Sequence, residues 1–194
     1  MRFGQGYGLT EVAPPCKKME QTLAQSMSIG YNQSMSNDLE LKTVGADCLR
    51  QISEDFELSP DTQGELDALL ERMEQIMFDE DGIGLAAPQV GVNKRILMIA
   101  NRGSRRYPGS PAIPLTVFIN PEITWVSRRT NDFEEGCLSV PDERIILTRP
   151  RDVKVRWTSP SGRKHHEKLT GLLARVFLHE FDHLEGRLIL DYVE

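Results

Sequence analysis

The pentapeptide His179-Glu180-Phe181-Asp182-His183 combines residue types that can bind a metal ion and move a proton. If this segment is helical, residues four apart project within roughly 40° of each other, so both imidazoles lie on one side. They can then bind one metal ion, while Glu180 lies close enough to transfer a proton. A solvated helix with two surface histidines is the alternative interpretation.

The neighbouring residues favour a buried metal site over that alternative. Leu172 and Val176 precede the two histidines at helical spacing, which predicts that all four side chains face the interior. An inward pair of imidazoles beside a carboxylate needs a partner that offsets its burial. We therefore expect the helix to present His179 and His183 to a metal ion.

The third metal ligand is expected upstream of this helix. In the extended zinc-peptidase motif a third histidine follows the second, but the matching position here is Ile189, which cannot bind a metal. The upstream segment Glu135-Gly136-Cys137-Leu138-Ser139 offers a thiolate, which is a strong ligand for zinc or ferrous iron. A Cys-His-His set leaves a coordination position open for water, which is typical of a catalytic site.

A third segment, Gly82-Ile83-Gly84-Leu85-Ala86-Ala87-Pro88-Gln89, is rich in glycine but lacks the preceding strand and the Lys-Ser/Thr of a phosphate-binding loop. In chain order, the three segments resemble the motifs of the peptide deformylase family. These motifs are Gly-x-Gly-x-Ala-Ala-x-Gln, Glu-Gly-Cys-x-Ser and His-Glu-x-x-His, and the chain matches every defined position. The resemblance covers about residues 41–194.

The resemblance implies a metal-dependent hydrolase that removes the formyl group from the N-terminal formyl-methionine of nascent polypeptides and releases formate. Cys137, His179 and His183 would hold one divalent metal ion. Fe²⁺ is the expected ion, and Zn²⁺, Ni²⁺ or Co²⁺ could replace it, because the same ligands accept all four.

The resemblance also assigns roles around the metal. Glu180 would act first as a general base and then as a general acid. The Gln89 side-chain amide and the Leu138 backbone N–H would stabilise the negative charge that develops on the formyl oxygen. An apolar pocket would accept the methionine side chain. The residues implied to bind the substrate are Ile83, Gly84, Phe133, Arg144, Leu172 and Val176.

Four further positions carry expectations from the resemblance. Glu135 and Asp182 are expected to orient the metal-binding histidines, as carboxylates commonly do. Arg175 is expected at the mouth of the pocket, with its guanidinium in water. Leu178 replaces a glutamine of many family members, which removes a polar neighbour but no ligand.

The composition limits which partners and which cellular compartment are expected for the protein. The net charge is −6, without a basic patch dense enough to indicate a nucleic-acid function. The arginines of segment 102–106 are expected on a solvated loop. The ribosome, in transient contact, is the remaining candidate partner. No apolar run approaches the ~18–20 residues that span a membrane. Three cysteines without a disulfide spacing indicate a reducing compartment, and we expect a cytoplasmic enzyme.

The chain divides into two parts. Residues 1–38 are rich in Gln, Ser, Met, Gly and Asn and predict a disordered N-terminal extension, followed by a catalytic domain over 39–194. Import into an organelle is the alternative for the extension, but Arg2, Lys17 and Lys18 are its only basic residues, and transit peptides are typically richer in arginine.

Periodicity predicts the elements that position these motifs. A helix is expected to begin at 59–61 and to bury its apolar face, and the metal-binding helix should span 172–184 and end at Gly186. Strands are expected at 95–100, 116–120, 123–127, 145–148, 152–158, 163–169 and 188–193. The predicted fold is α+β: a single domain of antiparallel strands packed around a central C-terminal helix that carries the His-Glu-x-x-His motif.

Two other functions compete with this interpretation. A zinc-dependent endopeptidase shares the histidine motif, but Cys137 and Ile189 argue against it. A non-catalytic protein with this scaffold would be expected to lose Glu180 or Gln89, and both are present.

Overall fold

The structure, a computed structural model, describes residues 39–193, so the predicted extension 1–38 lies outside the described residues. Its helices and strands are η1 (Asp47–Arg50), α2 (Gln63–Asp79), β1 (Gly84–Ala86), η2 (Ala87–Val90), β2 (Ile96–Asn101), β3 (Ile113–Val126), β4 (Thr130–Cys137), β5 (Val140–Pro150), β6 (Asp152–Thr158), β7 (Lys164–Thr170), α3 (Gly171–Leu184) and η3 (Ile189–Tyr192). None of the described helices combines the length and the apolar character that crossing a membrane requires.

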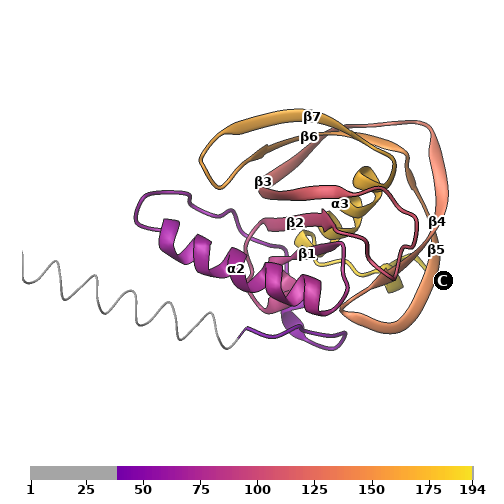
Figure 1. Cartoon of the computed structure of the whole chain (residues 1–194), viewed down its shortest axis with the longest axis horizontal. Coiled ribbons are helices and arrows are strands. Elements are labelled where there is room, and N and C mark those ends of the chain that lie inside the picture. The colour runs from indigo at the N-terminus through magenta and orange to yellow at the C-terminus, as the bar shows by residue number, and fades with distance from the viewer. Residues whose placement is uncertain (1–38, 194) are drawn as a thin grey trace, which may run out of the picture.

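The strands form two antiparallel sheets. The larger sheet has the order β1-β2-β3-β6-β7, and β4 pairs with β5 in a separate two-stranded ribbon. Helix α3 lies inside the molecule, between the large sheet and the β4–β5 ribbon (Figure 1). Helix α2 lies on the other side of the large sheet. This arrangement confirms the predicted α+β domain with antiparallel strands around a central C-terminal helix.

Strand β2 links two hydrophobic cores because both of its faces are buried. Leu97 and Ile99 pack into a cluster that includes α3, while Ile96 and Met98 on the opposite face pack into a cluster that includes α2. The alternation of strand side chains therefore fixes one helix on each side of the sheet. The apolar face predicted for α2 is buried as expected, with Leu66, Leu69, Met73, Ile76 and Met77 at its centre.

Helix α2 begins later than predicted. Its first helical residue is Gln63, and Ser59 instead belongs to a turn that precedes the helix. The Thr62 N–H donates to the Ser59 carbonyl oxygen at 3.2 Å, and the Thr62 hydroxyl donates to the Glu57 carbonyl oxygen at 2.7 Å. These local bonds hold the segment in a turn, which Ser and Thr side chains commonly stabilise.

Three strand predictions need correction. The two strands expected at 116–120 and 123–127 are one strand, β3, whose pairing shifts register between Ile119 and Glu122. Strand β4 was not predicted, because most of its side chains are exposed and five of its eight residues are polar or charged. The final strand expected at 188–193 is wrong: the Asp191 carboxylate accepts the Leu188 N–H at 2.8 Å and closes a 3₁₀ turn.

The end of α3 confirms Gly186 as the residue that stops it. Gly186 has φ of 69°, a left-handed conformation that favours glycine. The Gly186 N–H donates to the His183 carbonyl oxygen at 3.2 Å, and the Arg187 N–H donates to the Asp182 carbonyl oxygen at 2.9 Å. A Cβ at position 186 would lie 2.7 Å from the Arg50 carbonyl oxygen, so η1 packs directly against this turn.

Candidate active site

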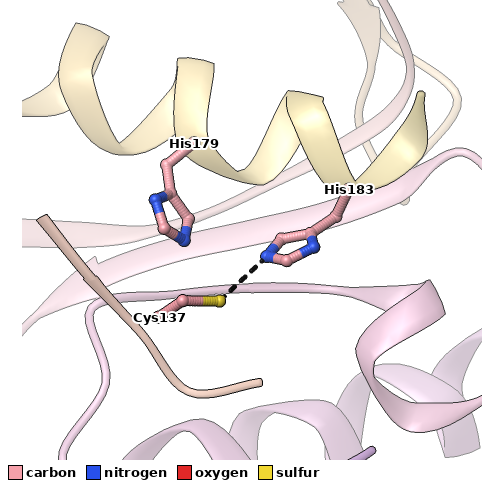
Figure 2. Close-up of side chains that lie close together, drawn as sticks. All are labelled: Cys137, His179 and His183. Atoms are coloured by element: carbon pink, nitrogen blue, oxygen red, sulfur yellow. Dashed lines mark hydrogen bonds between the residues drawn. The ribbon is translucent and has the colours of Figure 1, made fainter. Parts of the chain in front are cut away.

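Three side chains from two elements meet at a buried cluster. His179 and His183 project from successive turns of α3, and Cys137 reaches them from the end of β4 (Figure 2). Their potential ligand atoms all lie within 4.8 Å of one another, and Cys137 Sγ is 3.3 Å from His183 Nε2. The predicted ligand set therefore converges in the folded chain.

The orientation of His179 is fixed by Glu135, which is on β4 two residues before Cys137. His179 Nδ1 is 2.9 Å from Glu135 Oε2. Because an ionised carboxylate can only accept, Nδ1 carries a proton, and Nε2 is the ring nitrogen that can offer its lone pair to a metal ion. The hydrogen bond thus prepares Nε2 of His179 as a metal ligand.

Two buried arginines hold Glu135 in place. Arg149 on β5 donates to both Glu135 carboxylate oxygens, at 2.7 and 3.0 Å, and Arg175 on α3 donates to Oε1 at 2.8 Å. Burial alone would raise the pKa of Glu135, but its hydrogen bonds and the neighbouring charges of His179 and Arg149 lower that pKa to about 2. Glu135 is therefore a buried, permanently charged carboxylate at neutral pH.

The two arginines also bind further residues around Glu135, near the C-terminus for Arg149 and on β4 for Arg175. Arg149 also donates to Asp182 at 2.6 Å, and the Tyr192 hydroxyl donates to the same Asp182 oxygen at 2.9 Å. Arg175 donates in addition to the backbone and side-chain oxygens of Asn131. The expectation that the Arg175 guanidinium reaches water is wrong. The residue is 5% exposed, because its guanidinium turns inward and forms an ion pair with Glu135.

The ionisation of the two histidines fits a divalent metal. Burial and the charge of His179 hold the pKa of His183 well below its ordinary value, so His183 is a neutral donor. Burial lowers the pKa of His179 as well, but the charge of Cys137 and the hydrogen bond to Glu135 raise it well above its ordinary value. In the protein without a metal ion His179 thus carries a positive charge, and a bound metal ion would replace that charge as Nε2 gives up its proton.

Glu180 lies beside this cluster without a hydrogen-bond partner for one oxygen. Its Oε2 is buried and unpaired among the described residues, and burial raises the pKa of Glu180 to about 7. The opposite wall is Gly84, where a Cβ would lie 2.7 Å from Val176 Cγ1 and closer still to Glu180 Oε1. Glycine is thus required at position 84 to leave room for this carboxylate.

The Gln89 amide is aimed at the cluster by its own turn. Its Oε1 accepts the Ala86 N–H at 2.8 Å, which directs the amino group to the other side. Gln89 Nε2 lies 3.1 Å from Ser139 Oγ and 3.8 Å from Cys137 Sγ. A side-chain donor therefore points permanently into the site, as stabilisation of a developing negative charge requires.

A pocket opens next to Glu180 and His179. Five of the six residues expected to bind substrate line it, namely Ile83, Gly84, Phe133, Leu172 and Val176, together with Leu138 and Gln89. The sixth, Arg144, lies outside this lining and pairs with Glu134 at 3.3 Å. Most of the wall is apolar, so the pocket suits an unbranched apolar side chain beside a polar reaction centre.

Sequence reasoning missed Arg106 and Tyr107, which also line the pocket. The sequence placed the arginines of 102–106 on a solvated loop, but Arg106 is only partly exposed. No local motif identifies it, because its position depends on contacts of the β2–β3 loop with β4 and β5, which are distant in sequence.

The geometry agrees with comparisons to known proteins. A sequence model of the family described as polypeptide deformylase matches residues 39–194. A peptide deformylase of Rhizorhabdus wittichii is 45% identical over 145 residues, covering 75% of this chain and 80% of its own length. One from a Picosynechococcus strain is 41% identical over 168 residues, covering 87% of this chain and 86% of its own length.

Solved structures show the same likeness. The crystal structure of a probable peptide deformylase from Synechococcus phage S-SSM7 has a TM-score of 0.72 and 42% identity, and it covers 80% of this chain and 100% of its own. A Met-Ala-Ser-bound class I type b peptide deformylase from Acinetobacter baumannii has a TM-score of 0.74 and 36% identity, with 80% and 98% coverage.

The charge of Glu135 should govern stability in acid. Its folded-state pKa of about 2 lies below its ordinary value of 4.5, which corresponds to roughly 3 kcal/mol. This stabilisation is fully present above pH 4.5 and is lost as the pH falls through 2. Glu135→Gln should therefore lower the free energy of unfolding by about 3 kcal/mol at pH 6. The deficit should shrink between pH 4.5 and 2.

Urea unfolding in a chelating buffer, followed by circular dichroism over this pH range, measures the effect without a metal contribution. Glu134→Gln is the matched control, because the neighbouring Glu134 side chain is 58% exposed and, among residues 39–193, forms an ion pair with Arg144 alone. Its loss should stay under about 1 kcal/mol. Equal effects of the two substitutions would show that Glu135 has no special role.

Proposed function

The chain belongs to the peptide deformylase family, and we infer that it removes the formyl group from the N-terminal formyl-methionine of nascent polypeptides, releasing formate. The observation that carries this function is the convergence of Cys137, His179 and His183 beside Glu180 in a largely apolar pocket. The enzyme is a metal-dependent hydrolase that acts on a linear amide.

Cys137, His179 and His183 are proposed to hold one divalent metal ion. When bound, the ion supplies the Lewis acidity that makes water nucleophilic near neutral pH. The chain's own contribution is to fix the donors: Glu135 holds the proton of His179 on Nδ1, and burial keeps His183 neutral. A site with three protein ligands leaves room for water and substrate.

Glu180 is proposed to carry the protons of the reaction. Hydrolysis of a formamide requires that a proton leave the attacking water and that one reach the departing amine. The unpaired Glu180 oxygen is free to take the first, and the resulting acid can deliver it to the amine. A pKa raised by burial to about 7 suits both directions of transfer near neutral pH.

Gln89 and Leu138 are proposed to stabilise the formyl oxygen as it becomes negative. The support for Gln89 is its amino group, which the bond from the Ala86 N–H holds toward Cys137. The support for Leu138 is its place directly after Cys137 in the lining of the pocket, next to the proposed metal ligand. Donors fixed in advance lower the barrier because they need no rearrangement.

The methionine side chain is proposed to enter the apolar pocket. Ile83 and Val176 are buried in its wall, Leu172 and Phe133 stand at its more open side, and Gly84 gives clearance. An unbranched, polarizable side chain fits such a surface. Arg144 is proposed to bind the peptide beyond this pocket. The pocket is thus apolar where the methionine side chain would lie and polar where the formyl amide would lie.

The cellular context is proposed from the function. Nascent chains carry the formyl group as they leave the ribosome, so transient contact with the ribosome and a cytoplasmic location follow. Residues 1–38 are proposed as an extension outside the catalytic domain, 39–194, because the family match begins at residue 39.

Metal binding and proton transfer should separate by mutation. Replacing Cys137, His179 or His183 with Ala should remove tight metal binding and activity together. Glu180→Gln should keep the metal and lose at least about 10²-fold in turnover, because general acid–base catalysis typically contributes 10²–10⁴-fold. Formate release from formyl-Met-Ala-Ser and elemental analysis of the purified proteins measure the two properties.

An internally blocked peptide without a formyl group is the control substrate, and it should not be cleaved. Cleavage of that peptide would point to an endopeptidase. A Glu180→Gln protein that loses its metal, or that stays fully active, would show that Glu180 is not the proton carrier.

Fe²⁺ is proposed as the physiological metal. The support is the Cys-His-His donor set, whose thiolate suits a soft ferrous ion, within a family resemblance where iron is usual. Thiolate ligation also makes the centre sensitive, because oxygen can oxidise the iron or Cys137 itself. Activity of the iron form should therefore decay in air, whereas nickel- or cobalt-substituted protein should keep its activity.

Anaerobic preparation of the iron, zinc and nickel forms, followed by timed exposure to air, tests the proposal. Equal turnover and equal lifetime of the iron and zinc forms would contradict the choice of iron and leave the deformylase function intact.

A further inference from the structure

A shallow depression adjoins the substrate pocket, and three residues belong to the walls of both. These are Arg106, Tyr107 and Phe133. A peptide whose first side chain fills the pocket must continue along one of the adjoining surfaces. The depression is lined further by Pro108, Gly109, Ser110, Glu134 and Arg144.

Arg106 is the unpaired charge at this boundary. It is partly buried, and no described carboxylate lies within salt-bridge distance of its guanidinium. Its neighbours differ: Arg105 is 3.7 Å from Asp81 with a side chain that is 91% exposed, and Arg144 is 3.3 Å from Glu134. A partly desolvated cation without a partner favours a ligand that brings a negative charge.

The guanidinium of Arg106 lies against the strand that carries Cys137. A Cβ at Gly136 would be 3.5 Å from Arg106 Nη2, so the arginine covers the backbone next to the metal ligand. Tyr107 stacks on Phe133 with 6.1 Å between ring centroids, and its hydroxyl accepts the Gly136 N–H at 3.5 Å. The aromatic pair and Arg106 therefore lie together at the boundary between the pocket and the depression.

The loop that presents Arg106 is held by side-chain bonds. Asn101 Oδ1 accepts the N–H groups of Gly103 and Ser104 at 3.0 and 3.1 Å. Ser104 Oγ donates to the Asp81 carbonyl oxygen at 2.9 Å and accepts the Arg106 N–H at 3.1 Å. A loop fixed in this way loses little entropy when it binds a ligand, which favours a built site over a mobile surface charge.

Arg144 supports the same loop from the other side. It donates to the Arg106 carbonyl oxygen at 3.3 Å, and its guanidinium lies 5.4 Å from the centroid of the Tyr107 ring. Because Glu134 already offsets its charge, Arg144 positions the loop and Arg106 supplies the free positive charge.

We propose that Arg106 and its loop form a carboxylate-binding site for formylated peptides that carry an acidic residue directly after the methionine or one position later. A guanidinium can donate two parallel hydrogen bonds to a carboxylate, which gives both charge and geometric recognition. The proposal rests on the deformylase function above and adds a preference among its substrates. Nascent chains with an early Asp or Glu would then be processed faster than their neutral counterparts.

Matched peptides with amidated C-termini test the site. Formyl-Met-Xaa-Ser and formyl-Met-Ala-Xaa, each with Xaa as Glu or Gln, differ only in the charge. At low salt the wild-type kcat/KM should be about fivefold higher for Glu than for Gln at one of the two positions, as for a partly exposed ion pair. In assays at about 0.5 M salt, the ratio of the Glu to the Gln kcat/KM should fall toward one, because salt screens the charges.

Arg106→Gln should bring the Glu-to-Gln ratio to about one, and Arg106→Lys should keep part of it. Arg105→Gln is the matched control, since it removes the adjacent charge of the same loop, and it should leave the ratio unchanged. Thermal unfolding of all variants shows that each is folded. A third set of peptides carries a free C-terminal carboxylate and no acidic side chain. A higher kcat/KM for these peptides than for their amidated forms would show that a chain end can also bind, and a higher kcat/KM with either carboxylate supports the site.

A wild-type ratio of one for every carboxylate, or equal shifts in the Arg106 and Arg105 variants, would overturn the proposal. Failure of the deformylase function itself would look different, because no formate would be released from the neutral peptides either.

Discussion

The buried charge of Glu135 is the constraint on which the rest of the site depends. A carboxylate inside a protein is costly unless it is paired and hydrogen-bonded. Here Arg149, Arg175 and His179 all donate to it. These partners come from β5 and α3, while Glu135 itself is on β4. The pairing therefore joins the ribbon to the central helix at the level of the metal ligands.

This requirement explains why the molecule needs its second sheet. The large sheet and α3 could form a hydrophobic core alone, since β2 and its neighbours already bury α3 on one face and α2 on the other. What that core lacks is a cysteine sulfur and a carboxylate opposite the histidines. The β4–β5 ribbon supplies both, two residues apart, and the ion pairs set its position against α3. A third apolar cluster, which includes Cys137 and Leu188, packs behind it.

The sequence predicted the parts of the structure that local patterns encode. The spacing of His179 and His183 placed both on one helix face, and the apolar period of α2 identified its buried side. Strand β4 was missed because its exposed, acidic side chains lack a hydrophobic alternation. It is a strand because it pairs with β5, and a local sequence pattern does not reveal that pairing. The burial of Arg175 was also missed, since it follows from ion pairs between distant segments and not from its neighbours in the chain.

Metal affinity tests the central role of Glu135 most directly. Glu135→Gln keeps the size of the side chain and removes the charge that orients His179. Titration with Co²⁺ at pH 7.5, against a chelator of known affinity, measures binding to the Cys-His-His set in the folded protein. The affinity of the variant should be weaker than that of the wild type by about 10- to 100-fold. An unchanged affinity, with the protein folded, would contradict the claim that the buried Glu135 cluster prepares the metal site.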